Sequence, residues 1–199
     1  MGVHDKSLAL LEWFFAKFPM TTSVLELGSQ NFYQNYGSAR YGQYADAYYR
    51  LKGIRNYDCI DMNGENGAKV LDLSKPIDSI GMYDLVTDFG TQEHISSTFD
   101  SEALYNCWTT KYDAALRHII SVNPKTGHWP KHGAYFFTME FYRVLSRLTG
   151  LRVVRLEEHF AMGNSVDGWE VLCVFEKTPS SHWITLDEFE EAFEELKPV

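Results

Sequence analysis

A short apolar run that stops at a glycine, Val24-Leu25-Glu26-Leu27-Gly28, constrains the fold more than any other feature of this sequence. The run lacks the alternation of polar and apolar residues that is typical of a strand with one face in water. Strands without that alternation are buried on both faces, as in a parallel sheet covered by helices. Gly28 permits a sharp turn or the close approach of a ligand. Glu26 lies near the carboxyl end of the strand, where open α/β sheets bind their ligands.

Three further segments repeat the pattern of an apolar strand that ends near an acid. The sequence predicts strands at 57–61, 70–73 and 83–90, which end near Asp61, Asp72 and Asp88. Together with the first strand, they place four carboxylates near one edge of a parallel sheet. Clustered carboxylates repel one another unless a cation or hydrogen-bond donors offset their charge. We therefore interpret this edge as a binding site for a ligand that carries positive charge or donor groups.

The remaining segments predict helices alternating with further strands in a single domain over 1–199. Helices are expected at 7–18, 43–51 and 100–116, between Thr138 and Gly150, and from Thr185 onward, where Glu188 completes a capping box. Strands are expected at 118–122, 151–156 and 170–175, with loops at 123–133 and 157–169. Within the domain we distinguish an N-terminal helical segment (1–22), a tyrosine-rich insert (31–53) and an acidic C-terminal helix (183–199).

Composition narrows the classes of function. The formal net charge is −9 and no block of Lys or Arg occurs, which argues against nucleic acid as a partner. Residues 8–18 are interrupted by Glu12 and Lys17 and are too short to span a bilayer. Three cysteines in apolar settings favour buried thiols in a reducing compartment. We expect a cytoplasmic protein without a membrane partner, and the tyrosine-rich insert is a candidate interface for a homo-oligomer.

With its strands in this order, the chain resembles the class I S-adenosylmethionine-dependent methyltransferases over roughly 24–177. The stretch Asp88-Phe89-Gly90-Thr91-Gln92-Glu93-His94 is similar to a strand end in a branch of small bacterial and phage-type members. The resemblance implies an α/β, Rossmann-like fold with a mostly parallel sheet of seven strands and helices on both faces. It also implies that the last strand is antiparallel and lies between the fifth and the sixth.

The resemblance further implies S-adenosylmethionine as the cofactor. Residues 26–28 resemble the segment that borders its methionine end, and Asp61 the acid that binds the ribose hydroxyls. Asp72 and Leu73 resemble the pair that faces the adenine, and residues 88–90 the strand end beside the methyl donor. The residues implied to bind the cofactor are Glu26, Leu27, Gly28, Ser29, Asp61, Met62, Asp72, Leu73, Asp88, Phe89 and Gly90.

The chemistry of the cofactor supports this reading independently of the family name. S-adenosylmethionine is a cation with hydroxyl and amine donors, so its site needs acceptors spread over several strand ends. A dinucleotide instead needs a glycine-rich turn for its pyrophosphate. Here Ser29 and Gln30 stand where glycines would be expected, and NAD is disfavoured.

Candidates for a general base lie just after the fourth and fifth strands. We rank His94 and His132 first, and His128 and Glu93 next, because an imidazole titrates near neutral pH. The same four side chains were weighed as a metal site. Pro130, between His128 and His132, argues against a helix that presents both histidines, and we expect no metal.

These observations favour a methyltransferase that acts on a small molecule or a glycan, at oxygen. The alternative is a catalytically inactive methyltransferase-like module for binding or assembly, motivated by the missing glycines and the tyrosine-rich insert. A third hypothesis is another nucleotide-binding α/β protein. It predicts that a nucleotide displaces any bound adenosyl compound.

Overall fold

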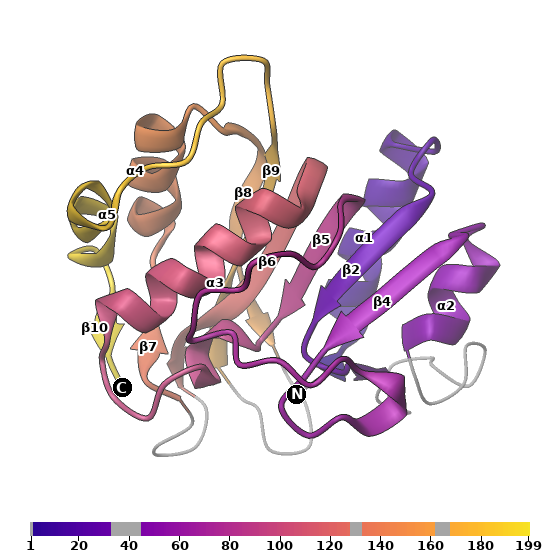
Figure 1. Cartoon of the computed structure of the whole chain (residues 1–199), viewed down its shortest axis with the longest axis horizontal. Coiled ribbons are helices and arrows are strands. Elements are labelled where there is room, and N and C mark those ends of the chain that lie inside the picture. The colour runs from indigo at the N-terminus through magenta and orange to yellow at the C-terminus, as the bar shows by residue number, and fades with distance from the viewer. Residues whose placement is uncertain (1, 33–44, 128–132, 162–167) are drawn as a thin grey trace.

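The computed structural model describes residues 2–32, 45–127, 133–161 and 168–199. At its centre is a six-stranded sheet with the strand order β4-β2-β5-β6-β9-β8 (Figure 1). The strands are β2 (Ser23–Leu27), β4 (Asn56–Ile60), β5 (Tyr83–Phe89), β6 (Ala115–Gly127), β8 (Arg152–Ala161) and β9 (Gly168–Glu176). All pairs are parallel except those of β9, which runs antiparallel to β6 and to β8. The predicted mostly parallel sheet, with its antiparallel last strand inserted before the edge, is confirmed.

Helices cover both faces of this sheet, as predicted. They are α1 (Asp5–Lys17), α2 (Ala45–Leu51), α3 (Ser101–Ala114), α4 (Met139–Thr149) and α5 (Leu186–Phe193). One apolar cluster joins α1 and α2 to one face, and a second joins α3, α4 and α5 to the other. Figure 1 shows α3 in front of the sheet and α1 behind it. Successive strand residues alternate between the clusters, so that Val24 faces α1 and Leu25 faces the opposite layer.

Four short strands and two turns of 3₁₀ helix lie outside the central sheet and around its carboxyl edge. β1 (Gly2–Val3) pairs in parallel with β3 (Asn31–Phe32), and β7 (Tyr135–Phe136) pairs antiparallel with β10 (Lys197–Pro198). Two turns of 3₁₀ helix, η3 (Glu65–Gly67) and η4 (Gln92–His94), follow β4 and β5. The pairing of β1 with β3 ties the N-terminus to the segment that follows the first glycine turn.

The helix ends match the predicted capping residues. The Thr138 hydroxyl accepts a hydrogen bond from the Phe141 N–H, and Gly150 ends the same helix in the left-handed conformation. Thr185 and Glu188 form the reciprocal capping box at the start of α5. In the tyrosine-rich insert, Tyr48 and Tyr49 of α2 are buried against α1.

The prediction of a strand at 70–73 is wrong, and the sheet has six strands where seven were expected. One isolated parallel bridge, between Ile60 and Lys69, marks the place beside β4 where a further strand would lie. Val70 is 64% exposed, so this segment has no second covered face to hold it in the sheet. Asp72 accepts hydrogen bonds from the backbone and the hydroxyl of Ser74, which turns the chain instead.

The late strands are longer than predicted. β6 continues to Gly127 and β8 to Ala161, where loops had been expected from 123 and from 157. The reason is that β9, from Gly168 onward, pairs with β6 up to Gly127 and with β8 up to Ala161. Interstrand hydrogen bonds use only the backbone, so they extend past the apolar core into residues whose side chains carry no strand pattern.

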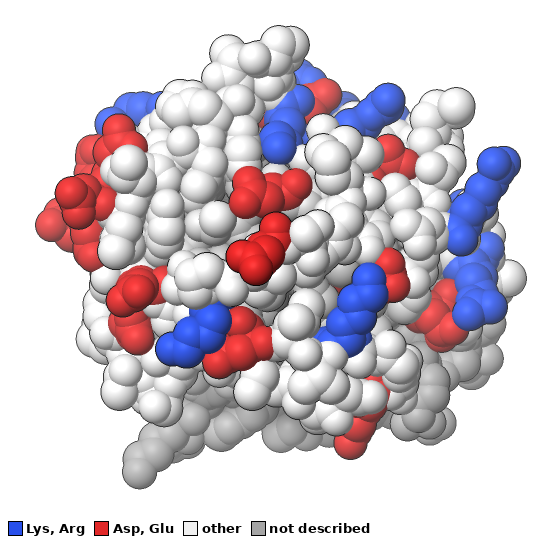
Figure 2. Space-filling view, in the orientation of Figure 1, with Lys and Arg blue, Asp and Glu red and all other residues white. Residues whose placement is uncertain are grey.

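The remaining features of the fold are the lengths of its helices, the charges on its surface and its cysteines. Among the described residues, no helix combines the length and the apolar character needed to cross a membrane. On the face shown in Figure 2, Lys and Arg side chains are interspersed with Asp and Glu, and acidic side chains gather over α5. All three cysteines, Cys59, Cys107 and Cys173, are buried and free.

Candidate functional site

A cavity of about 420 Å³ opens at the carboxyl ends of β2, β4 and β5. Its size lies within the usual range of small-molecule sites. Open α/β sheets bind ligands at this edge because strand ends and the loops after them leave a crevice there. The described residues that line it are Gly28, Ser29, Gln30, Ile60, Asp61, Met62, Leu71, Asp72, Leu73, Ser74, Gly90, Thr91, His94 and Ile95.

Gly28 is a structural requirement of the first loop of the cavity. Its φ is +79°, and a Cβ at this position would lie 2.2 Å from Oγ1 of Thr91. The Thr91 hydroxyl approaches so closely because it donates a 2.7 Å hydrogen bond to the carbonyl of Leu27. The glycine therefore allows β2 and the end of β5 to come together at the cavity wall.

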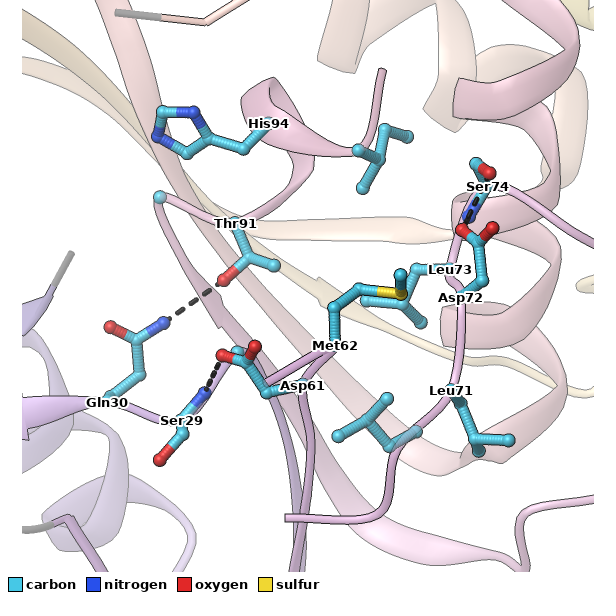
Figure 3. Close-up of a pocket in the computed structure, with 14 residues that line it drawn as sticks. Ser29, Gln30, Asp61, Met62, Leu71, Asp72, Leu73, Ser74, Thr91 and His94 are labelled. Carbon is cyan, nitrogen blue, oxygen red and sulfur yellow. Dashed lines mark hydrogen bonds between the residues drawn. The ribbon is translucent and has the colours of Figure 1, made fainter. Parts of the chain in front are cut away.

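Ser29 and Gln30 fit this loop without the glycines that the family pattern would place there. Among the described residues, Asn66 is the one non-glycine with positive φ, so neither Ser29 nor Gln30 needs a left-handed backbone. The Gln30 side chain donates to the Leu27 carbonyl (3.3 Å) and to Thr91 Oγ1 (3.1 Å). These bonds join the loop to the ends of β2 and β5 (Figure 3).

Asp61, which follows β4, lines the cavity and accepts two backbone hydrogen bonds. Its Oδ2 accepts from the N–H of Ser29 at 2.9 Å, and its Oδ1 accepts from the N–H of Asn63 at 3.1 Å. The first bond joins the ends of β4 and β2. A carboxylate held in this way presents its remaining lone pairs to hydroxyl donors in the cavity.

Asp72 and an apolar wall form the far side of the cavity. Figure 3 shows Met62 extending toward Leu73, with Asp72 beside it and Asp61 on the other flank. The hydroxyl and backbone of Ser74 donate to Asp72 and hold its pKa below its ordinary value. Apolar side chains beside a fixed carboxylate suit a flat ring that carries a donor group. The apolar residues of the wall are Ile60, Met62, Leu71, Leu73 and Ile95.

Glu26, predicted to bind the cofactor, lies behind the cavity and not in its lining. Its side chain is fully buried on the α2 face of β2, and burial raises its pKa to about 8. Oε2 accepts a 2.7 Å hydrogen bond from the Tyr57 hydroxyl and a 3.2 Å bond from the N–H of Gln30. Glu26 thus holds the cavity loop from beneath, as a positioning residue.

Asp88, also predicted at the cofactor, turns to the opposite side of the sheet. Its Oδ2 lies 2.5 Å from Nζ of Lys111, and both side chains are fully buried. Its Oδ1 accepts the N–H of Thr91 at 2.9 Å, so Asp88 shapes the turn that Gly90 and Thr91 present to the cavity. Leu27 and Phe89 are buried in the two apolar clusters, and their side chains do not line it.

The structure therefore brings together seven of the predicted cofactor residues in one cavity and assigns the other four to its support. The seven are Gly28, Ser29, Asp61, Met62, Asp72, Leu73 and Gly90. Sequence reasoning missed several residues of the lining, because each lies next to a predicted residue without a chemical signal of its own. Those that it missed are Gln30, Ile60, Leu71, Ser74, Thr91 and Ile95.

Of the candidate bases, His94 lines the cavity and Glu93 lies buried beside it. The His94 side chain is 42% exposed, and its Nε2 lies 3.6 Å from Oε1 of Glu93. Burial raises the pKa of Glu93 to about 8, against the opposing charge of His94. The carbonyl of Glu93 accepts a 2.8 Å hydrogen bond from the N–H of Ala134. The other two candidates, His128 and His132, lie outside the described residues.

The charge of the lining selects among ligands. The described residues that line the cavity include two carboxylates and one imidazole but no Lys or Arg. Nucleotide phosphates are usually bound by cationic side chains or by a glycine-rich turn at a helix N-terminus. The lining therefore favours a ligand with positive charge and hydroxyl or amine donors over a nucleotide.

Comparison with known proteins identifies the fold. Neither a protein-family model nor a curated protein matches the chain. Solved structures do match. Magnesium protoporphyrin IX methyltransferase (ChlM) from Synechocystis PCC 6803, with bound S-adenosylmethionine, aligns with a TM-score of 0.55 and 13% identity over 85% of this chain and 77% of its own.

Two further structures give the same result. The plantazolicin methyltransferase BpumL, in complex with S-adenosylhomocysteine, has a TM-score of 0.54 and 11% identity, covering 84% of this chain and 82% of its own. The N-methyltransferase NodS from Bradyrhizobium japonicum WM9 has a TM-score of 0.51 and 12% identity, covering 83% and 92%. The chain thus has the class I methyltransferase fold predicted from its strand ends.

Proposed function

We propose that this protein is an S-adenosylmethionine-dependent methyltransferase that binds its cofactor in the cavity at the ends of β2, β4 and β5. The observation that carries the proposal is the lining, in which carboxylates on two successive segments flank an apolar wall and no described side chain is Lys or Arg. The fold supports it, because this crevice is the ligand-binding edge of an open α/β sheet.

The ribose, the adenine and the methionine end of the cofactor each have neighbouring residues in this proposal. Asp61 would accept hydrogen bonds from the ribose hydroxyls, and Asp72 with Leu73 would hold the adenine. Gly28 and Gly90 let the backbone come close to the methionine end. When bound, S-adenosylmethionine supplies an electrophilic methyl group on a sulfonium.

His94 acts as the general base in this proposal, and the acceptor is a hydroxyl of a small molecule or a glycan. The imidazole of His94 borders the cavity and takes the proton from the acceptor hydroxyl as that oxygen is methylated. Glu93, 3.6 Å away, is the buried neighbour of this imidazole. His128 and His132 stay in the proposal as further candidates, and the cytoplasm as its location.

Calorimetric titration with S-adenosylhomocysteine tests the cofactor site. We expect the wild-type protein to bind, and Asp61→Ala to weaken binding by about 10- to 100-fold, the cost of a lost hydrogen bond to a charged group. Glu65→Gln is the matched control, because it removes an exposed carboxylate in the neighbouring η3, outside the lining. Binding that is absent, or equal in wild type and Asp61→Ala, contradicts the assignment.

Transfer of labelled methyl groups to a panel of hydroxylated small molecules and glycans tests the activity. For an acceptor found in this way, His94→Gln should lower kcat by about 10²- to 10⁴-fold, the usual contribution of a general base. Its affinity for S-adenosylhomocysteine should stay that of the wild type. Binding of S-adenosylhomocysteine without transfer to any acceptor would favour the inactive binding module instead.

A further inference from the structure

Three side chains, one from the N-terminal segment and two from neighbouring strands, converge beside the carboxyl edge of the sheet. His159 of β8 and Glu170 of β9 are directly opposite each other in the antiparallel ladder, and Glu170 also pairs with Pro124 near the end of β6. His4 joins them from the turn between β1 and α1. Its position is fixed by the pairing of β1 with β3, which holds Val3 opposite Phe32.

Each imidazole directs its Nε2 atom at the same carboxylate oxygen. His4 Nε2 lies 2.8 Å from Glu170 Oε2, and His159 Nε2 lies 2.9 Å from that oxygen. The three ligand atoms all lie within 4.8 Å of one another. Ser7 Oγ is 3.3 Å from His4 Nε2, so a fourth polar atom borders the same point.

We propose that His4, His159 and Glu170 form a binding site for one divalent transition-metal ion, with Zn²⁺ as the preferred ion. Two imidazole nitrogens and a carboxylate oxygen are the protein ligands of a common class of zinc centres, in which a fourth position stays open. Calcium and magnesium are disfavoured, because they take oxygen ligands almost exclusively.

The two nitrogen–oxygen distances match this chemistry after a small adjustment. Around a tetrahedral zinc ion with bonds of about 2.0–2.1 Å, neighbouring ligand atoms lie about 3.3 Å apart. The two nitrogens therefore need to move away from the carboxylate oxygen by about half an ångström, which side-chain torsions absorb. The backbone already fixes two ligands, because His159 and Glu170 are neighbours across a ladder of main-chain hydrogen bonds.

Burial makes the site selective and still accessible. The side chains of His4, His159 and Glu170 are 15%, 11% and 6% exposed. A largely dehydrated site strengthens the attraction between a cation and a carboxylate, and the remaining exposure of the imidazoles gives an ion a path from solvent. Leu172 and Val174, which share the face of Glu170 along β9, belong to the α1-side apolar cluster, so the site lies on that face.

The metal proposal does not depend on the proposed methyl transfer. Glu170 lies at the carboxyl edge of the sheet, on the antiparallel strand beside β6. None of the three residues of the metal site lines the cavity described above. The two proposals therefore fail or succeed separately. A bound ion would tie the N-terminal segment to β8 and β9, in addition to any role toward a substrate.

The experiment measures zinc bound to the full-length chain, purified without a histidine tag. The protein is stripped with a chelator, dialysed against Zn²⁺ and then against buffer, and its zinc content is determined by mass spectrometry, with affinity from competition against a chelating dye. Glu170→Gln and His159→Gln remove one ligand each and keep the side-chain size. His182→Gln is the matched control, because His182 is exposed and lies outside the cluster.

We expect one zinc per chain in the wild type and in His182→Gln. Loss of one ligand should lower the affinity by more than about 100-fold, since even residues that only support a ligand contribute about 10- to 100-fold. Circular dichroism of the metal-free variants distinguishes a lost ligand from a lost fold, and His159→Gln serves if Glu170→Gln does not fold. Less than stoichiometric zinc in the wild type, or equal affinity in wild type and folded ligand variants, would show that the three groups form a hydrogen-bonded clamp without metal.

Discussion

The ammonium group of Lys111 lies 2.5 Å from Oδ2 of Asp88, and neither side chain is exposed to solvent. Lys111 also donates to Oε1 of Gln92 at 2.6 Å and lies over the ring of Trp108, 4.2 Å from its centroid. The pair joins α3 to the end of β5, where the chain turns into the cavity wall. The acid at this strand end is thus offset by a buried cation of the protein itself.

Removing the cation alone should be costly. Lys111→Met leaves the carboxylate of Asp88 buried without its partner and should destabilise the protein by about 3–5 kcal/mol. The double variant Lys111→Met/Asp88→Asn leaves no buried charge, so its loss should be smaller than the sum of the two single losses. Urea unfolding of the four proteins measures this cycle. Additive losses would show that the two groups do not interact.

The burial of Lys111 could have been predicted from the sequence, because this residue occupies the inner face of a predicted helix. Leu104, Cys107 and Trp108 define that face, and Lys111 stands at the next position of the same periodicity. A lysine there indicates a buried partner. Asp88 was a natural candidate for that partner, but the resemblance implied a role for it at the cofactor instead.

The strand ends were predictable as positions, but the direction of each side chain was not. Successive residues of a strand point to opposite faces, so the acid at a strand end faces the cavity only when its register allows it. Asp61 follows the last residue of β4 and reaches the cavity, whereas Glu26 lies inside β2 and faces α2. Both strands have five residues, and Asp61 lies two positions beyond Cys59, the residue of β4 that pairs with Glu26.

Contacts between distant segments lay beyond sequence reasoning. His4 is separated from His159 and Glu170 by most of the chain, and none of the three stands in a motif. Their meeting depends on the register of β8 against β9 and on the pairing of β1 with β3. Helix caps such as Thr138 and Thr185 depend only on a few neighbouring residues, and they were predicted correctly.

Gly28→Ala should destabilise the protein by about 2–4 kcal/mol, because it adds a steric overlap to a left-handed backbone. The new Cβ would meet Thr91 Oγ1 at 2.2 Å. Gly53→Ala is the matched control, since Gly53 has a φ of +84° but no atom within 4 Å of its Cβ position. It should cost only the backbone strain of about 1–2 kcal/mol. Thermal unfolding compares the two, and equal losses would contradict a role for Thr91.

Glu26 should make the protein less stable as the pH rises from about 5 to about 8. Burial raises its pKa from 4.5 to about 8, so over this range the folded state keeps a proton that the unfolded state has released. Stability is full below the unfolded pKa and falls by at most about 1.4 kcal/mol per pH unit for each such group. Glu93, whose pKa burial also raises to about 8, contributes in the same direction.

Glu26→Gln separates these two contributions. The variant cannot ionise, so its stability should fall less steeply between pH 5 and pH 8 than that of the wild type, by about half if the two acids contribute equally. Urea unfolding at several pH values measures the slope. Glu65→Gln, which alters an exposed carboxylate, should leave the slope as it is. An unchanged slope in Glu26→Gln would mean that Glu26 is ionised in the folded protein at neutral pH.

Gln30→Gly tests whether the missing glycines weaken the cofactor site. The change restores a residue typical of the family but removes the hydrogen bonds of the Gln30 amide to Leu27 and Thr91. Together with the added freedom of a glycine in the unfolded chain, this should cost about 1–2 kcal/mol of stability. Because the Gln30 backbone needs no left-handed conformation, affinity for S-adenosylhomocysteine should stay within about threefold of wild type. A gain of about tenfold or more would show that the side chain obstructs the cavity, and that the wild-type loop is a degraded cofactor site.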